Sequence, residues 1–246
     1  MPKYSQAIID DNLISNDLKN RLKAQIELLE NIPEEKKDWH PGSNHQVLDL
    51  IHPSMYCFVD KLSLSKREPP VEEKKKRNWW DPEIIEPEGP RCQWLPAEFE
   101  VDYENESDPK VNINSYINNI DQVKQKELYS VIGEIFGKFH SQLKNNSELE
   151  GIGSNIGKTN KLQVIVKAAN IIVTPEKPYY CGGTFHKEGM PYEHIAATGI
   201  YYYHSENVKK SYLEFRSEIS EPFSYGQDNV KGCYDMVRSP QFLLFS

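Results

Sequence analysis

The chain has 246 residues, of which 38% are hydrophobic and 27% are charged, and its formal net charge is -8. This length suits one large domain, or one domain with an N-terminal extension. The negative charge argues against nucleic acid as a main partner, because the phosphate backbone requires a positive surface. No run of 18 apolar residues is present, so we expect no membrane span.

The N-terminal segment "MPKYSQAIIDDN" has no basic stretch followed by an apolar run, and we therefore expect no signal peptide. The cysteines lie far apart without a CxxC pair, unlike a disulfide framework or a zinc ribbon. They are Cys57, Cys92, Cys181 and Cys233. These features predict a cytoplasmic or nuclear protein with reduced cysteines.

Residues 15–31 have apolar side chains at helical spacing behind a Ser/Asn/Asp start, and Pro33 follows, so the pattern predicts an amphipathic helix. Residues 38–62 have short apolar runs between prolines and glycines, which are typical of turns and short elements. Residues 65–91 are rich in proline and charge and predict a loop. The basic run "EEKKKR" within that loop is flanked by acids and is typical of a solvated surface.

Residues 92–104 alternate Phe99 and Val101 with acids and predict a strand, and residues 110–118 predict another. A wide apolar stripe predicts a helix over 121–144. The β-branched and aromatic runs beyond it predict a mostly antiparallel sheet. These runs are 161–175, 194–204 and 211–219.

These elements predict an α+β fold. We expect a helical and irregular N-terminal region, residues 1–150, packed on a β region, residues 151–246, in one compact unit.

Two segments look like binding motifs at first sight. In "GIGSNIGKT" (151–159), a phosphate-binding loop would need glycine at Ile152 and a dinucleotide loop would need glycine at Ile156, so we expect no nucleotide site. The histidines His40, His45 and His52 have spacings that fit neither a zinc finger nor a metal-binding helix. We assign these three histidines turn and capping roles beside Pro41 and Pro53.

"GGTFHKEGMPYEH" (182–194) contains His186 and Glu188 two residues apart. On a strand, residues i and i+2 point to the same face, so this imidazole and this carboxylate would lie side by side. A strand can supply two of the three ligands of a 2-His-1-carboxylate iron site in this way. The same pair also fits an ordinary polar strand edge.

Four segments, spanning about residues 37–216, resemble a fungal family known as domain of unknown function 4246. They are "KDWHPGSNHQVLDLIHPSMY", "CQWLPAEFEV", "SYINNI" and "KLQVIVKAANIIVTPEKPYYCGGTFHKEGMPYEHIAATGIYYYHSENVKKSYLEFR". The resemblance implies a C-terminal double-stranded β-helix (jelly roll) of an oxygenase. It also implies that His186 and Glu188 bind Fe(II), with 2-oxoglutarate as cosubstrate.

The chain departs from the family pattern in its last part. Family members continue to a further histidine, the distal iron ligand, and to an arginine that holds the 2-oxo-acid carboxylate. Here no histidine follows His204, and Tyr192 stands where the family has asparagine. We therefore expect an incomplete jelly roll that binds Fe(II) weakly, does not turn over 2-oxoglutarate and self-associates through open sheet edges.

The favoured function is therefore an Fe(II)/2-oxoglutarate oxygenase-like protein, inactive without its distal ligand, that acts on an unknown small molecule or protein. One alternative is a non-catalytic binding protein that uses residues 201–203 and the tryptophans of the 65–91 loop as a contact surface. The other is a zinc hydrolase with His186, Glu188 and His194 as ligands.

Overall fold

The computed structural model describes most of the chain. The described residues are 8–59, 92–103, 109–145, 160–184, 186, 189, 193, 195–214 and 243–245. The predicted loop 65–91 and the glycine-rich segment 151–159 lie outside them. The chain divides into two compact units: unit 1 is Met1–Tyr180 with Glu188–Tyr203, and unit 2 is Cys181–Lys187 with His204–Ser246.

The predicted N-terminal helix is confirmed as α1, Asn16–Glu30. Ser15 caps its start, because the Ser15 hydroxyl accepts a hydrogen bond from the Leu18 N–H at 3.2 Å. Its apolar stripe is buried through Leu18, Leu22 and Ile26. A single 3-10 turn, η1 (Glu34–Lys36), follows it.

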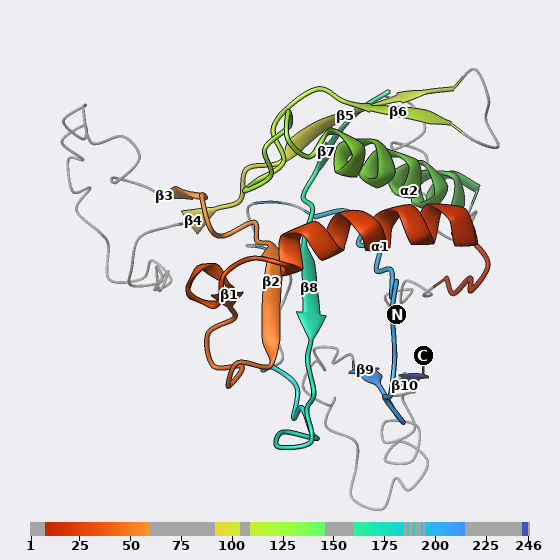
Figure 1. Ribbon diagram of the computed structural model, residues 1–246. Coiled ribbons are helices and arrows are strands. Elements are labelled where there is room, and N and C mark those ends of the chain that lie inside the picture. The colour runs from red at the N-terminus through yellow and green to blue at the C-terminus, as the bar shows by residue number, and fades with distance from the viewer. Residues whose placement is uncertain are drawn as a thin grey trace, which may run out of the picture. The chain divides into compact units, whose positions relative to one another are not determined.

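The first three-stranded sheet contains β1 (Asp38–Trp39), β2 (Val47–Ile51) and β8 (Ala168–Ile171) in the order β1-β2-β8. Both pairs are antiparallel. Figure 1 shows β2 and β8 side by side below α1. This sheet therefore joins the N-terminal hairpin to a strand from far along the chain.

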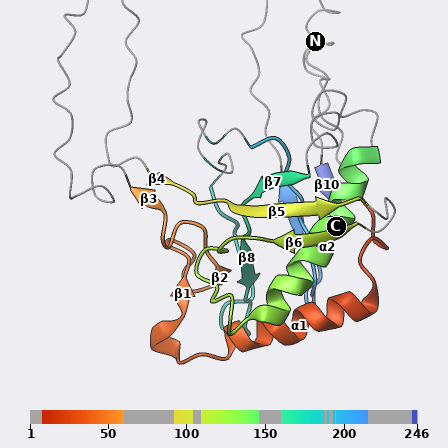
Figure 2. The same cartoon turned by 90° about the horizontal axis from the view of Figure 1, so that it is seen from above.

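The second three-stranded sheet contains β5 (Ala97–Asp102), β6 (Lys110–Ile113) and β7 (Lys161–Val164) in the order β6-β5-β7, again antiparallel. Helix α2 (Lys126–Asn145) packs on β6 and on α1. In Figure 1, α2 lies between β6 and α1, and Figure 2 shows the same elements from above. The start of β6 lies close to α2: a Cβ at Gly137 of α2 would be only 2.8 Å from the carbonyl oxygen of Pro109, the residue before β6.

The described residues also form two short antiparallel ladders. One joins β3 (Phe58–Val59) to β4 (Cys92–Gln93), and the other joins β9 (Tyr212–Glu214) to β10 (Leu243–Phe245) within unit 2. Cys57, immediately before β3, is disulfide-bonded. This corrects the expectation that all cysteines are reduced, which rested on their wide spacing in sequence.

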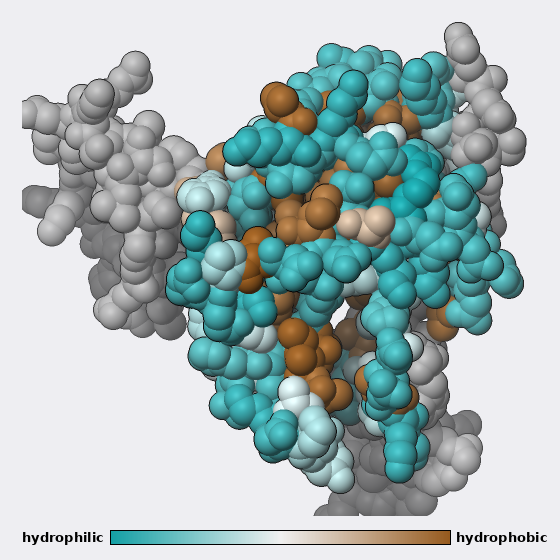
Figure 3. Space-filling model, in the orientation of Figure 1, coloured by the Kyte–Doolittle hydropathy of each residue, from teal (hydrophilic) through white to brown (hydrophobic). Residues whose placement is uncertain are grey.

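The core of unit 1 lies between the two helices and the two three-stranded sheets. Its most buried side chains come from β2, β5, α2 and the 117–120 turn, and they include Ile51, Phe99, Ile117, Ile120 and Leu128. On the face shown in Figure 3, hydrophilic side chains predominate and hydrophobic ones form separate patches. Burial of this apolar surface is the main stabilising contribution to the unit.

The structure confirms an α+β fold with antiparallel sheets, but it describes small separate sheets and not a double-stranded β-helix. The strand expected at 194–204 is not formed over residues 195–204. Side-chain contacts hold part of this segment instead. The Tyr203 hydroxyl donates to Asn170 of β8, and Gly199 lies against the Phe139 ring of α2. Aromatic and β-branched composition alone therefore gave the wrong structure there.

A membrane-spanning helix needs about 20 mostly apolar residues. Within the described ranges, no helix meets this requirement.

Candidate metal centre

The β1–β2 hairpin has one apolar face and one polar face. Asp38 lies opposite Asp49, and Trp39 lies opposite Leu48. Because side chains alternate along a strand, Trp39 and Leu48 face the core, whereas Asp38 and Asp49 share the other face. His40, two residues after Asp38, returns to this polar face.

A β-bulge brings His52 to the same face. The register of β2 against β8 shifts between Asp49 and Ile51, which leaves Leu50 as the extra residue. In a regular strand, residues 49 and 52 would point to opposite faces. The extra residue shifts the alternation by one position. Leu50 and Ile51 are therefore both buried in the core, and His52 lies on the same face as Asp49.

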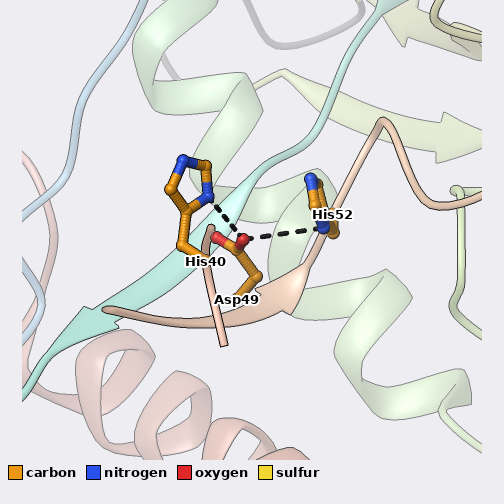
Figure 4. Close-up of side chains that lie close together, drawn as sticks. All are labelled: His40, Asp49 and His52. Carbon is orange, nitrogen blue, oxygen red and sulfur yellow. Dashed lines mark hydrogen bonds and ion pairs between the residues drawn. The ribbon is translucent and has the colours of Figure 1, made fainter. Parts of the chain in front are cut away.

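The three side chains meet at one carboxylate oxygen. The His40 Nδ1 lies 2.8 Å from Asp49 Oδ2, and the His52 Nδ1 lies 3.5 Å from the same oxygen. Figure 4 shows both rings turned toward this atom. His52 also pairs with Asp38, whose Oδ2 lies 2.6 Å from its Nδ1. The atoms of His40, Asp49 and His52 that could bind a metal ion, one from each residue, all lie within 4.8 Å of one another.

Asp49 is the buried centre of the cluster. Its side chain is 1% exposed, whereas those of His52 and His40 are 18% and 44% exposed. Among the described residues, no hydrogen-bond partner reaches its second oxygen, Oδ1, which is also buried. Two carboxylates that face each other across a ladder repel, and a buried carboxylate is unfavourable without compensation. The cluster is therefore suited to a positive charge.

The two distances to Asp49 Oδ2 fit the coordination sphere of a transition metal. With metal–ligand distances of about 2.0–2.2 Å, neighbouring ligand atoms lie about 3 Å apart in an octahedron and slightly further in a tetrahedron. The two contacts to Asp49 Oδ2, at 2.8 and 3.5 Å, are close to such edges. Two imidazoles and one carboxylate also form the donor set of mononuclear iron sites and of some zinc sites.

The third histidine of the segment has another role. The His45 ring stacks on Trp39, with centroids 5.4 Å apart. The Trp39 indole N–H in turn donates to Glu34 at 3.0 Å. His45 is thus part of the packing beside the cluster, and only His40 and His52 reach Asp49.

Of the residues predicted as metal ligands, the structure describes His186. His186 is exposed, belongs to no strand, and its Nδ1 lies 2.7 Å from the Thr184 carbonyl oxygen. Glu188 and His194 lie outside the described residues, so the proposed pairing of His186 with Glu188 stays a prediction. His204 pairs with Glu206 at 3.3 Å.

One part of the cluster has a signal in the sequence. Asp38 and His40 are two residues apart next to a strand, which is the same i, i+2 pattern that pointed to His186 and Glu188. Asp49 has no such signal, because its spacing of three to His52 places the two on one face only if the strand contains a bulge.

Comparison with known protein families gives a match over most of the chain. Residues 2–148 and 139–241 match the family described as "Protein of unknown function (DUF4246)". No curated protein and no solved structure matches the chain.

Proposed function

Because the chain belongs to the DUF4246 family, whose function is unknown, its activity has to be inferred from its site, and we propose that His40, Asp49 and His52 bind a divalent transition metal. The observation that carries this proposal is the convergence of two Nδ1 atoms on one oxygen of a buried aspartate. The buried Oδ1 of Asp49 supports it, because this atom has no hydrogen-bond partner among the described residues and such atoms are rare in proteins.

We propose Fe(II) as the metal and an oxygenase-like activity as the function. The 2-His-1-carboxylate donor set is typical of non-haem Fe(II) oxygenases, and it leaves coordination positions open. When bound, the metal supplies the redox chemistry with O2. The chain itself holds the metal through the three side chains, excludes water on the Asp49 side and leaves the half-exposed His40 side accessible.

The predicted cosubstrate, 2-oxoglutarate, stays part of this proposal. Its distal carboxylate needs a basic partner. The one arginine among the described residues, Arg21, is already bound by Glu127 and Glu134. An arginine clamp for this carboxylate would therefore come from outside the described ranges.

His186 and Glu188 form a second candidate ligand set, and with it comes the proposed jelly roll of the C-terminal region. One observation favours His186 as a ligand. Its Nδ1 lies against the Thr184 carbonyl oxygen, which can only accept, so Nδ1 carries the proton of this hydrogen bond. Histidines that bind metals usually have such a partner on the other nitrogen.

Metal titration of the full 246-residue chain separates the two ligand sets. We would prepare the metal-free protein, add Fe(II) under anaerobic conditions, and use Co(II) as a spectroscopic substitute. The test variants are Asp49→Asn and the double variant His186→Ala/Glu188→Gln. The matched control is Asp121→Asn, because Asp121 lies in an exposed turn and accepts hydrogen bonds from the N–H groups of Val123 and Lys124.

We expect one metal per chain, a loss of binding by orders of magnitude in Asp49→Asn, and wild-type binding in the other two variants. Wild-type affinity in Asp49→Asn would contradict the proposal. If the double variant alone loses the metal, then the site is at His186 and Glu188. Tight zinc with no Fe(II)-dependent consumption of 2-oxoglutarate would favour hydrolase chemistry, and no metal at all would favour a non-catalytic binding protein.

A further inference from the structure

The bulge in β2 leaves backbone polar groups next to the proposed metal site without their regular ladder partners. At a bulge, the extra residue leaves the ladder and its polar groups lose their regular partners. Here the extra residue is Leu50, and His52 follows two residues later. A side chain that binds the backbone between Leu50 and His52 would therefore also determine the direction in which the His52 ring leaves the strand.

The side chain of Asn119 binds the Leu50 carbonyl group and the backbone N–H of His52. Its Oδ1 accepts a hydrogen bond from the His52 backbone N–H at 2.8 Å, and its Nδ2 donates to the Leu50 carbonyl oxygen at 3.3 Å. Asn119 has a φ of 55°, in the left-handed region that asparagine tolerates better than most residues. One amide thus spans the bulge, with its donor on one side and its acceptor on the other.

This contact is supported from the core. Asn118, the preceding residue, is buried and donates to the Pro53 carbonyl at 2.6 Å. The Tyr129 hydroxyl of α2 accepts from the Ile117 N–H at 2.8 Å and donates to the Ile120 carbonyl at 3.2 Å. The turn that carries Asn119 is therefore anchored to the helix, and its position does not depend on the hairpin alone.

We propose that Asn119 is a positioning residue for the metal site: it fixes the bulge at Leu50 and thereby keeps the His52 ring directed at Asp49. The inference rests on the proposed metal binding by His40, Asp49 and His52. Asn119 touches no ligand atom of that cluster and acts only through the backbone of His52. Its loss should therefore weaken metal affinity and change the coordination geometry without removing a ligand.

The test compares Asn119→Gly with Asn207→Gly in the full chain. Glycine keeps the left-handed φ accessible at both positions and removes only the side chain. Asn207 has nearly the same φ, 57°, but lies in unit 2. We would measure the Co(II) dissociation constant, the visible spectrum of bound Co(II) and the thermal stability of the metal-free protein.

We expect Asn119→Gly to bind Co(II) about 10- to 100-fold more weakly than wild type, as for other residues that orient metal ligands. Its Co(II) spectrum should also change. Asn207→Gly should stay within about twofold of wild type, as is usual at exposed sites. If Asn119→Gly loses stability but keeps the affinity and spectrum of wild type, Asn119 has only a structural role and the inference is wrong.

Asn119→Asp gives a second test in case the glycine variant does not fold. Aspartate keeps the acceptor for the His52 N–H and loses the donor to Leu50, so we expect a smaller loss of affinity with a changed spectrum. Wild-type affinity and spectrum in Asn119→Asp would overturn the inference. Failure of the underlying metal site is recognised separately, because then wild type and Asp49→Asn do not differ.

Discussion

The two three-stranded sheets of unit 1 are built from strands of similar origin in the chain, but they differ in regularity. Each pairs two N-terminal strands with one strand from residues 161–171. In the second sheet, β5 alternates strictly between buried and half-buried residues, and every pair in its ladders is in register. In the first sheet, β2 is interrupted by the bulge at Leu50, and this sheet carries His40, Asp49 and His52.

The difference separates a sheet that supports the core from a sheet that carries the proposed metal ligands. A regular strand presents every second residue to the core, which stabilises the unit but keeps equally spaced side chains on the outer face. Bringing His52 next to Asp49 required a departure from that period. The regular sheet is therefore expected to govern stability, and the bulged sheet metal binding.

The largest expected effect is on the regular sheet. Phe99 in β5 is fully buried and packs edge-to-face on Phe136, with centroids 4.9 Å apart. Phe99→Ala should lower the free energy of unfolding by about 3–5 kcal/mol, because it leaves a cavity. Urea denaturation would measure this, with Val123→Ala at an exposed position as the control. The affinity of the remaining folded protein for metal should not change; a loss would mean that the two sheets do not have separate roles.

The next effect concerns metal affinity and compares His52, a proposed ligand, with His45 of the neighbouring turn. His52→Ala should weaken metal binding by orders of magnitude, because it removes a proposed ligand. His45→Ala removes a ring that stacks on Trp39 and should leave the affinity near that of wild type. Co(II) titration of both variants checks this prediction. Equal losses in the two variants would show that general damage to the hairpin, and not ligand removal, explains the result.

A smaller effect is expected at high pH, at the edge of the bulged sheet. Burial, and secondarily the charge of Glu30, raises the pKa of Tyr203 to about 12, from an ordinary value of 10.0. Below pH 10 this phenol is protonated in both states, whereas between pH 10 and 12 the unfolded chain loses its proton first. Stability should therefore fall as pH rises through this window.

The Tyr203→Phe variant tests this dependence by urea denaturation at pH 9 and at about pH 11.5, inside the window set by the two pKa values. Its loss of stability between these pH values should be smaller than that of wild type. Tyr202→Phe, at the exposed neighbouring position, is the control and should behave as wild type. An identical loss in all three proteins would show that Tyr203 does not contribute to the pH dependence.

The smallest expected effect is at the contact between the two helices. Arg21 of α1 binds Glu127 and Glu134 of α2, each at 2.7 Å, and the hydrogen bonds that Arg21 donates to Glu134 and Glu127 raise its pKa above the ordinary value. The three side chains are partly exposed, so Arg21→Ala should cost at most about 1 kcal/mol. The difference from wild type should shrink in concentrated NaCl. A larger, salt-independent loss would indicate that packing of the Arg21 side chain dominates.

The regular parts of the fold could be predicted from the sequence. The apolar stripes of α1 and α2 follow from one local period, and so does the alternation of Phe99 and Val101 with acidic residues in β5. Helix α2 begins several residues later than predicted, because Asp121 folds the preceding residues into a turn by accepting from the Val123 and Lys124 N–H groups.

The candidate site could be predicted only in part, because it depends on distant contacts. The sequence shows His40 and His52 as a cluster, but their spacing favoured turn and capping roles. The bulge that unites His52 with Asp49 is defined by pairing with β8 and held by Asn119, and neither partner is near in sequence. The 161–175 run was likewise predicted to belong to one sheet, whereas it forms β7 and β8 in two.

That division of one run between two sheets has a consequence for folding kinetics. Only Ile165, Val166 and Lys167 separate β7 from β8, yet β7 pairs with Phe99 and its neighbours and β8 with Leu48 and its neighbours. During synthesis, β2 and β5 emerge long before either partner and leave open strand edges, which are sites of aggregation. Such pairings between distant residues also slow folding. Both sheets should therefore be completed in one late, cooperative step when residues 161–171 become available.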